Sequence, residues 1–181
     1  MATSILTKSI AASVAACATE FAICSKLGLL GVACAPLGLP AAFSAVVAVN
    51  LVGSTFTLMG LGFKVSKARE EYGVEYPTMY ATGTDAKSTK FNCTQRGHQQ
   101  ALETYTSFVA CSLIGGITHP YFVAAAGIAW IVGRWKWAGG YATGDPKARY
   151  ESFWSRFIWF SLLGVMTAAM STAVRAVTGL Y

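Results

Sequence analysis

The sequence predicts an all-α, integral membrane four-helix bundle, and three observations point to it. Hydrophobic residues make up 54% of the 181 residues and charged residues only 12%, with a mean hydropathy of +0.48. This composition is wrong for a soluble domain of this length and favours the bilayer as solvent. The second observation is that the chain contains long runs without a charged residue. The third is a polar stripe, formed by Arg96, Gln100 and Glu103, at the start of one such run.

The uncharged runs define the expected helices, because a membrane span needs about 20 apolar residues. Residues 41–63 are long enough to cross, and the last span covers roughly 153–177. The run over 104–133 is interrupted at His119-Pro120. Because proline disfavours helical geometry in the residue before it, we expect two helices joined by a tight turn there.

These two middle helices must extend beyond the uncharged run, since each half alone is too short to span. We expect the first to begin near Phe91 and the second to continue to about Ala142. With the outer two, they make four spans.

Basic residues indicate which way the bundle faces, because Lys and Arg accumulate on cytoplasmic loops. Most of the 14 Lys and Arg residues lie between Lys64 and Arg156, and the tight turn has none. We assign Arg134 to the connection between the last two spans and expect no ionisable residue in the middle of a span. Both long connections then face the cytosol or an organelle matrix. Because the cations flank spans, nucleic acid is not an expected partner.

The first forty residues differ from the rest of the chain. They are rich in Ala and Ser, with Lys8 and Lys26 against the single acid Glu20. This composition is typical of an organelle transit peptide, although an extra interfacial helix fits equally well. We therefore expect an N-terminal extension over 1–40 and a four-span domain over 41–181. The five cysteines form no CxxC pair, so neither a disulfide framework nor a metal site is predicted.

The polar stripe is the strongest functional signal. Arg96, Gln100 and Glu103 are spaced at i, i+4 and i+7, which places them on one face of a helix. Ionisable groups at bilayer depth are costly and usually face a protein interior or an aqueous cavity. The stripe therefore predicts an anion-binding site at the mouth of a span.

Specific motifs resemble a known family. They are VSKAREEYGVEYPTMY (65–80), FNCTQRGHQQALE (91–103), and HPYFVAAAGIAWIVGR with GGYATGDPKAR (119–149). They resemble the membrane-associated proteins in eicosanoid and glutathione metabolism, the MAPEG family, over about residues 42–175. The resemblance implies four-helix protomers assembled as homotrimers, with glutathione bound between neighbouring subunits near the cytosolic face. A lipophilic co-substrate would enter from the membrane lipids.

The resemblance also assigns site residues. Glutathione carries two carboxylates, an ammonium group and a thiol, so its site needs arginines, an acid and a cation near the sulfur. Arg69 and Arg96 match the family's carboxylate-binding arginines, and Glu103 matches the acid that meets the ammonium. Arg149 matches the catalytic arginine that stabilises the thiolate, which is scarce at neutral pH. The other matched binding positions are His98, Gln100, Trp137 and Tyr141.

Two functions remain open on this basis. The resemblance implies a glutathione transferase that attacks lipophilic electrophiles or reduces lipid hydroperoxides, with glutathione as co-substrate and no metal. Its implied membrane is the endoplasmic reticulum, with a mitochondrial or plastid membrane as the alternative. The sequence departs from the family pattern at Glu70, Gln100 and Trp137. The departures at Glu70 and Gln100 and the Ala-rich extension favour a second hypothesis, a structural or accessory subunit of a larger organellar membrane complex.

Overall fold

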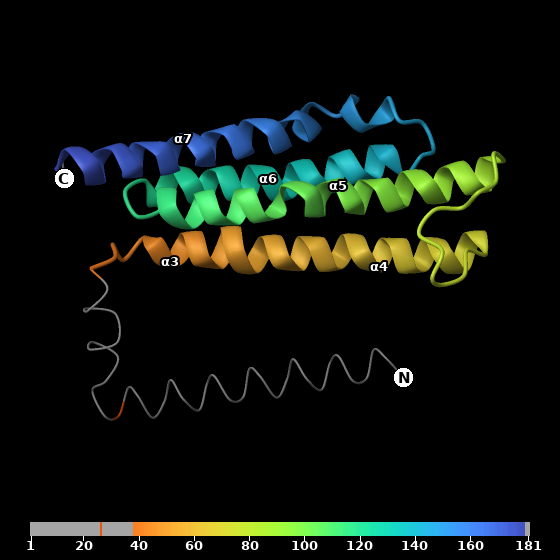
Figure 1. The fold of residues 1–181 in the computed structure, drawn as a ribbon, viewed down its shortest axis with the longest axis horizontal. Helices are drawn as coiled ribbons and strands as arrows, with labels where there is room; N and C mark the ends of the chain where they lie inside the picture. The colour runs from red at the N-terminus through yellow and green to blue at the C-terminus, as the bar shows by residue number, and fades with distance from the viewer. Residues whose placement is uncertain (1–25, 27–37, 180–181) are drawn as a thin grey trace. The chain divides into compact units, whose positions relative to one another are not determined.

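The computed structural model describes Lys26 and residues 38–179. The expectations for an N-terminal extension therefore lie almost entirely outside the described residues. Every regular element within those residues is a helix and none is a strand, which confirms the predicted all-α class. Figure 1 shows the long helices lying side by side.

The first long helix has three consecutive segments, α3 (Phe43–Val46), the π-helical η2 (Val47–Gly53) and α4 (Ser54–Tyr72). The second and third are α5 (Ala86–Gly115) and α6 (Pro120–Tyr141). Two short 3-10 turns, η3 (Ala148–Tyr150) and η4 (Phe153–Arg156), lead into the fourth, α7 (Phe157–Thr178).

Two of these helices are long and apolar enough to cross a membrane. They are the stretches Phe43–Tyr72 and Phe153–Thr178. The two middle helices do not meet the same criterion. They instead bury polar side chains, among them Gln95 and Gln100 on α5 and Arg134 on α6. The middle helices therefore carry polar groups into the interior of the bundle.

Two predicted boundaries were wrong. The first helix continues past Phe63 to Tyr72, because Leu61, Val65 and Ala68 extend its buried face at helical spacing. Lys64 and Arg69 accordingly lie on a helix rather than in a loop.

The second wrong boundary is the start of α5, which begins at Ala86 instead of near Phe91. The Asp85 side chain caps it by accepting hydrogen bonds from the backbone N–H groups of Lys87 (2.8 Å) and Ser88 (3.1 Å). The tight turn was predicted correctly, with Pro120 as the first residue of α6.

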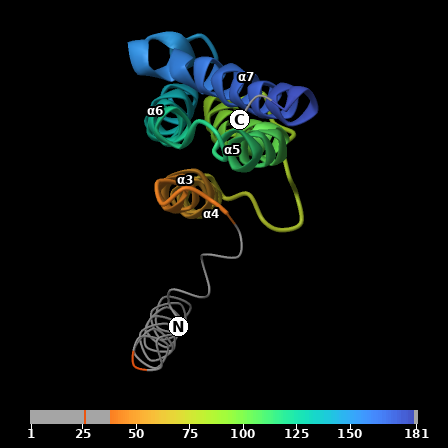
Figure 2. The ribbon, with the colours of Figure 1, turned by 90° about the vertical axis from the view of Figure 1, so that its left-hand side faces the viewer.

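The helices are arranged with α5 and α6 between α4 and α7, as the view along the bundle shows (Figure 2). The centre of the apolar core is a stack of Phe108 on Trp130, with ring centroids 4.5 Å apart. The α4–α5 and α6–α7 connections lie at one end of the bundle (Figure 1). This placement agrees with the basic residues, which predicted that both long connections face one side.

A buried amide fixes the other half of the bundle. Asn50, in the middle of η2, is fully buried, and its Nδ2 donates to Ser112 Oγ and to the Val123 carbonyl, both at 3.0 Å. The amide thereby joins the first helix to α5 and α6. Gly127 leaves room for this side chain, because a Cβ at that position would overlap with Asn50.

The packing around α6 predicts that alanine has opposite effects on stability at two of its glycines. Gly127→Ala should lower the free energy of unfolding by about 1–3 kcal/mol, because the added methyl group overpacks the junction. Gly139→Ala is the matched control, since a Cβ there meets nothing within 4 Å. It should raise the free energy of unfolding by about 0.5–1 kcal/mol through its better helix propensity. Thermal unfolding in mild detergent checks both, and equal effects would contradict the close contact.

Candidate functional site

An open cavity of about 380 Å³ lies at the end of the bundle that holds the long connections. Residues from α5, α6, η3 and α7 line it. Six of the predicted site residues line this cavity, namely Arg96, Gln100, Glu103, Trp137, Tyr141 and Arg149. The other lining residues were not predicted, and they are Thr104, Tyr150 and Trp159.

Arg96 and Glu103 form a bidentate ion pair on α5. The two guanidinium nitrogens lie 2.5 and 3.1 Å from the two carboxylate oxygens, and the side chains are 40% and 44% exposed. Pairs this exposed contribute little to stability, because water screens them. A ligand that carries both a carboxylate and an ammonium group can therefore replace the pair with small loss to the fold.

Arg134 lies behind this pair, and its position corrects the prediction that it belongs to a connection. It is on α6 with only 1% of its surface exposed, so an ionisable side chain does lie within a predicted span. Its guanidinium donates to Gln100 Oε1 and, at 2.6 Å, to Thr104 Oγ1, and it stacks on Trp130 with 4.9 Å to the ring centroid. No acidic partner for Arg134 occurs among the ion pairs of the described residues.

This arrangement orients the Gln100 amide. Arginine has only donors, so it must face the amide oxygen, and the amide N–H₂ group is left for the cavity. Gln100 is thus held as a donor toward the cavity by a neighbouring helix.

Arg149 reaches the cavity because η3 packs against the end of α6. A Cβ at Gly140 would overlap with the Ala148 carbonyl, so glycine permits this approach. The Arg149 guanidinium donates to the Pro146 carbonyl. It lies over the rings of Tyr141 and Tyr150, with 5.4 and 5.0 Å to the centroids.

Tyr150 joins the loop to α7. The Trp159 indole N–H donates to its phenol oxygen at 3.0 Å, and Trp137 lies edge-on to its ring, with centroids 6.4 Å apart. Burial raises the pKa of the Tyr150 phenol, but hydrogen bonding and the positive charge of Arg149 lower it more. The net pKa lies below the usual value for tyrosine.

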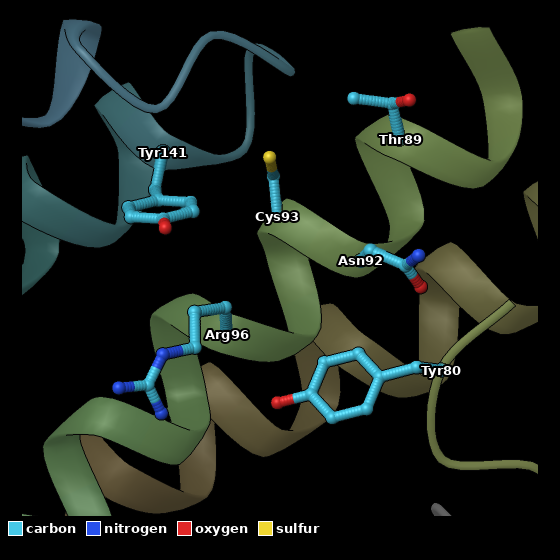
Figure 3. Close-up of a pocket in the computed structure, with 6 residues that line it drawn as sticks. All are labelled: Tyr80, Thr89, Asn92, Cys93, Arg96 and Tyr141. Carbon is cyan, nitrogen blue, oxygen red and sulfur yellow. The ribbon is translucent and has the colours of Figure 1, made fainter. Parts of the chain in front are cut away.

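A second cavity of about 300 Å³ adjoins the first and shares Arg96 and Tyr141 with it. Figure 3 shows these two side chains with Cys93 from α5 and Tyr80 from the preceding loop. Asn92 holds that loop against α5, because its amide exchanges two hydrogen bonds with the Ala81 backbone at 2.7 and 2.9 Å. The two cavities together follow α5 from Thr89 to Thr104.

Arg69 and His98 line neither cavity. Arg69 donates to the Thr78 carbonyl at 2.7 Å and stacks on Tyr76 at 4.4 Å, so it closes the loop after α4. Glu70 is exposed and forms no ion pair with it among the described residues. His98 lies against α4 beside Gly62.

The site residues that were not predicted differ in how easily the sequence alone could have indicated them. Arg134 lies about one turn before Trp137 on the same helix, and Thr104 lies about one turn after Gln100. Helical spacing alone could have found both. Tyr150 and Trp159 come from separate segments that only the fold brings together.

These features define a helical bundle whose polar end holds a cavity lined by arginines and aromatic rings. The sequence pattern of the MAPEG family matches residues 46–174, and the chain therefore belongs to this family. The family is membrane-associated and includes glutathione transferases and related enzymes.

The buried guanidinium predicts an asymmetric double-mutant cycle. Gln100→Met should lower the free energy of unfolding by about 3 kcal/mol, because it leaves the charge of Arg134 short of a partner. Arg134→Met should change it by less than about 1 kcal/mol, since water in the open cavity can bind Gln100 and Thr104. The double variant should regain most of the loss. Denaturant unfolding measures all three, and a larger loss in Arg134→Met than in Gln100→Met would contradict the assignment.

Proposed function

We propose that this protein is a membrane-embedded glutathione transferase of the microsomal glutathione transferase 3 type, which also reduces lipid hydroperoxides with glutathione. The observation that carries the proposal is the meeting of Arg96, Glu103 and Arg149 at one cavity. These side chains can bind one carboxylate, the ammonium group and the thiolate of a zwitterionic thiol tripeptide.

In this proposal Arg149 activates the thiol. A thiolate is the nucleophile, and a nearby cation increases its population at neutral pH. One of the five guanidinium donors of Arg149 binds the Pro146 carbonyl, which leaves others for the sulfur. The positive charge is already in place beside the expected position of the sulfur, so it can stabilise the thiolate without reorganisation during the reaction.

The rest of the tripeptide would lie along α5. Arg96 would bind a carboxylate with its planar fork, Glu103 the ammonium, and the Gln100 amide a backbone carbonyl. Trp159 is 39% exposed on the outside of the bundle and also lines the cavity. A lipophilic co-substrate would therefore reach the sulfur past this residue from the bilayer.

A homotrimer would account for the two predicted residues that lie away from the cavity. The family resemblance implies that glutathione binds between subunits, so Arg69 and His98 would act at an interface with a neighbour. The exposed apolar side chains of α4 and α7 are available for such contacts or for lipid; Phe56, Phe63, Phe160 and Leu163 are more than half exposed.

Replacing Arg149 tests the proposal. In Arg149→Ala the turnover of an electrophile should fall about 10²-fold, because the thiolate loses its counter-charge. Glutathione affinity should fall much less, since the carboxylate and ammonium contacts remain. The near-ultraviolet thiolate band on adding glutathione should disappear. Lys147→Ala, in the same loop and exposed, is the control and should retain the band.

Glutathione binding and assembly state, measured on the unmodified protein, distinguish between the two functions left open by the sequence. A parent that binds no glutathione and comigrates with a larger complex in mild detergent would favour the accessory-subunit hypothesis. Unchanged turnover in Arg149→Ala would show that Arg149 takes no part in the reaction. A free trimer that conjugates glutathione would exclude the accessory role.

A further inference from the structure

Reduction of a hydroperoxide makes a demand that conjugation does not. When a thiolate attacks the O–O bond, the leaving group is an alkoxide, a strong base that needs a proton. Chloride, the leaving group of a common aryl halide electrophile, needs none. The cavity must therefore hold a proton donor if it supports peroxide reduction.

Few of the lining groups can donate. The arginines stay protonated at neutral pH, and the carboxylate of Glu103 is held by Arg96. The Thr104 hydroxyl accepts from Arg134 and is directed toward backbone carbonyls of α5, each at 3.4 Å. The phenols of Tyr141 and Tyr150 remain.

The contacts favour Tyr150 as the donor. The Trp159 indole N–H points at the phenol oxygen, so this bond does not use the phenol's own proton. The proton has no acceptor among the described residues. The Arg149 guanidinium lies 5.0 Å from the ring centroid. Both neighbours stabilise the phenolate that proton transfer creates, in accord with the lowered pKa of Tyr150.

The position of Tyr150 fits the same role. It directly follows Arg149, so a sulfur held by that guanidinium lies beside the phenol. Its other contact, Trp159, is on the side from which a lipid would enter. Tyr150 therefore lies between the expected positions of the sulfur and the alkyl chain.

We propose that Tyr150 is a catalytic residue that protonates the alkoxide released from a lipid hydroperoxide. The inference rests on the proposed function. The glutathione thiolate attacks the terminal peroxide oxygen, a sulfur–oxygen bond forms and the O–O bond breaks. The sulfur is oxidised to a sulfenic acid, and the released alkoxide takes the phenol proton to become an alcohol. A second glutathione then converts the sulfenic acid to the disulfide and water, and solvent reprotonates the phenolate.

The test compares two reactions in the full-length protein. Tyr150→Phe removes the proton and keeps the ring. Rates are measured with a fatty-acid hydroperoxide and with 1-chloro-2,4-dinitrobenzene at saturating glutathione. The ratio of peroxide reduction to conjugation should fall about 10²-fold, as for loss of a general acid. Trp159→Phe should lower the ratio by a smaller factor, because the phenol stays but loses its hydrogen-bond donor.

A far-side control separates chemistry from structure. Tyr121 is 78% exposed near the α5–α6 turn, and Tyr121→Phe should leave the ratio at the parent value. If Tyr150→Phe lowers both rates equally, the residue is structural and the inference is overturned. A parent that conjugates but does not reduce hydroperoxides overturns the inference and leaves the transferase proposal intact. A parent with neither activity overturns both.

Discussion

The buried positive charge of Arg134 is the constraint on which the polar end of the bundle depends. A guanidinium inside a helical bundle must find acceptors, because an unpaired buried charge is very costly. Gln100 and Thr104 on the facing helix supply them. This requirement explains why α5 and α6 carry polar residues between two apolar outer helices. It also explains why the cavity forms here, since the acceptors of the charge are themselves cavity walls.

In the opposite half of the bundle, a neutral buried group sets how the helices pack. Asn50 connects three helices through one amide, and Gly127 gives it the necessary space. Such a contact tolerates one register only, because a helix shifted by a residue would bring a side chain onto the amide. The register set there is transmitted along the rigid helices α5 and α6. Gln100 and Arg134 consequently meet at the other end with hydrogen-bonding geometry.

The sequence predicted most of the fold and part of the site, for identifiable reasons. Uncharged runs located the helices and Pro120 located the turn, because both signals are local. The start of α5 was missed since Asp85 is an ordinary polar residue until its capping bonds are seen. Residues on the stripe from Arg96 to Glu103 were found because one helix face contains them. Tyr150 and Trp159 were not, because their contact joins a loop to α7. The hydrogen bond from Arg69 to the Thr78 carbonyl, in the loop after α4, likewise depends on the folded loop and was not predicted.

The Arg96–Glu103 pair offers a ligand both a cation and an anion at one place in the cavity. An incoming carboxylate that takes the two Arg96 nitrogens now bonded to Glu103 displaces this acid, which is then left to water or to a new cation. A zwitterion brings that cation with it, so the exchange conserves the number of ion pairs. A dicarboxylate without an amine would place a second negative charge beside Glu103 and offer this acid no cation. Under the proposed function, the pair would therefore favour amino acids and peptides over plain organic acids, by no more than an exposed ion pair contributes.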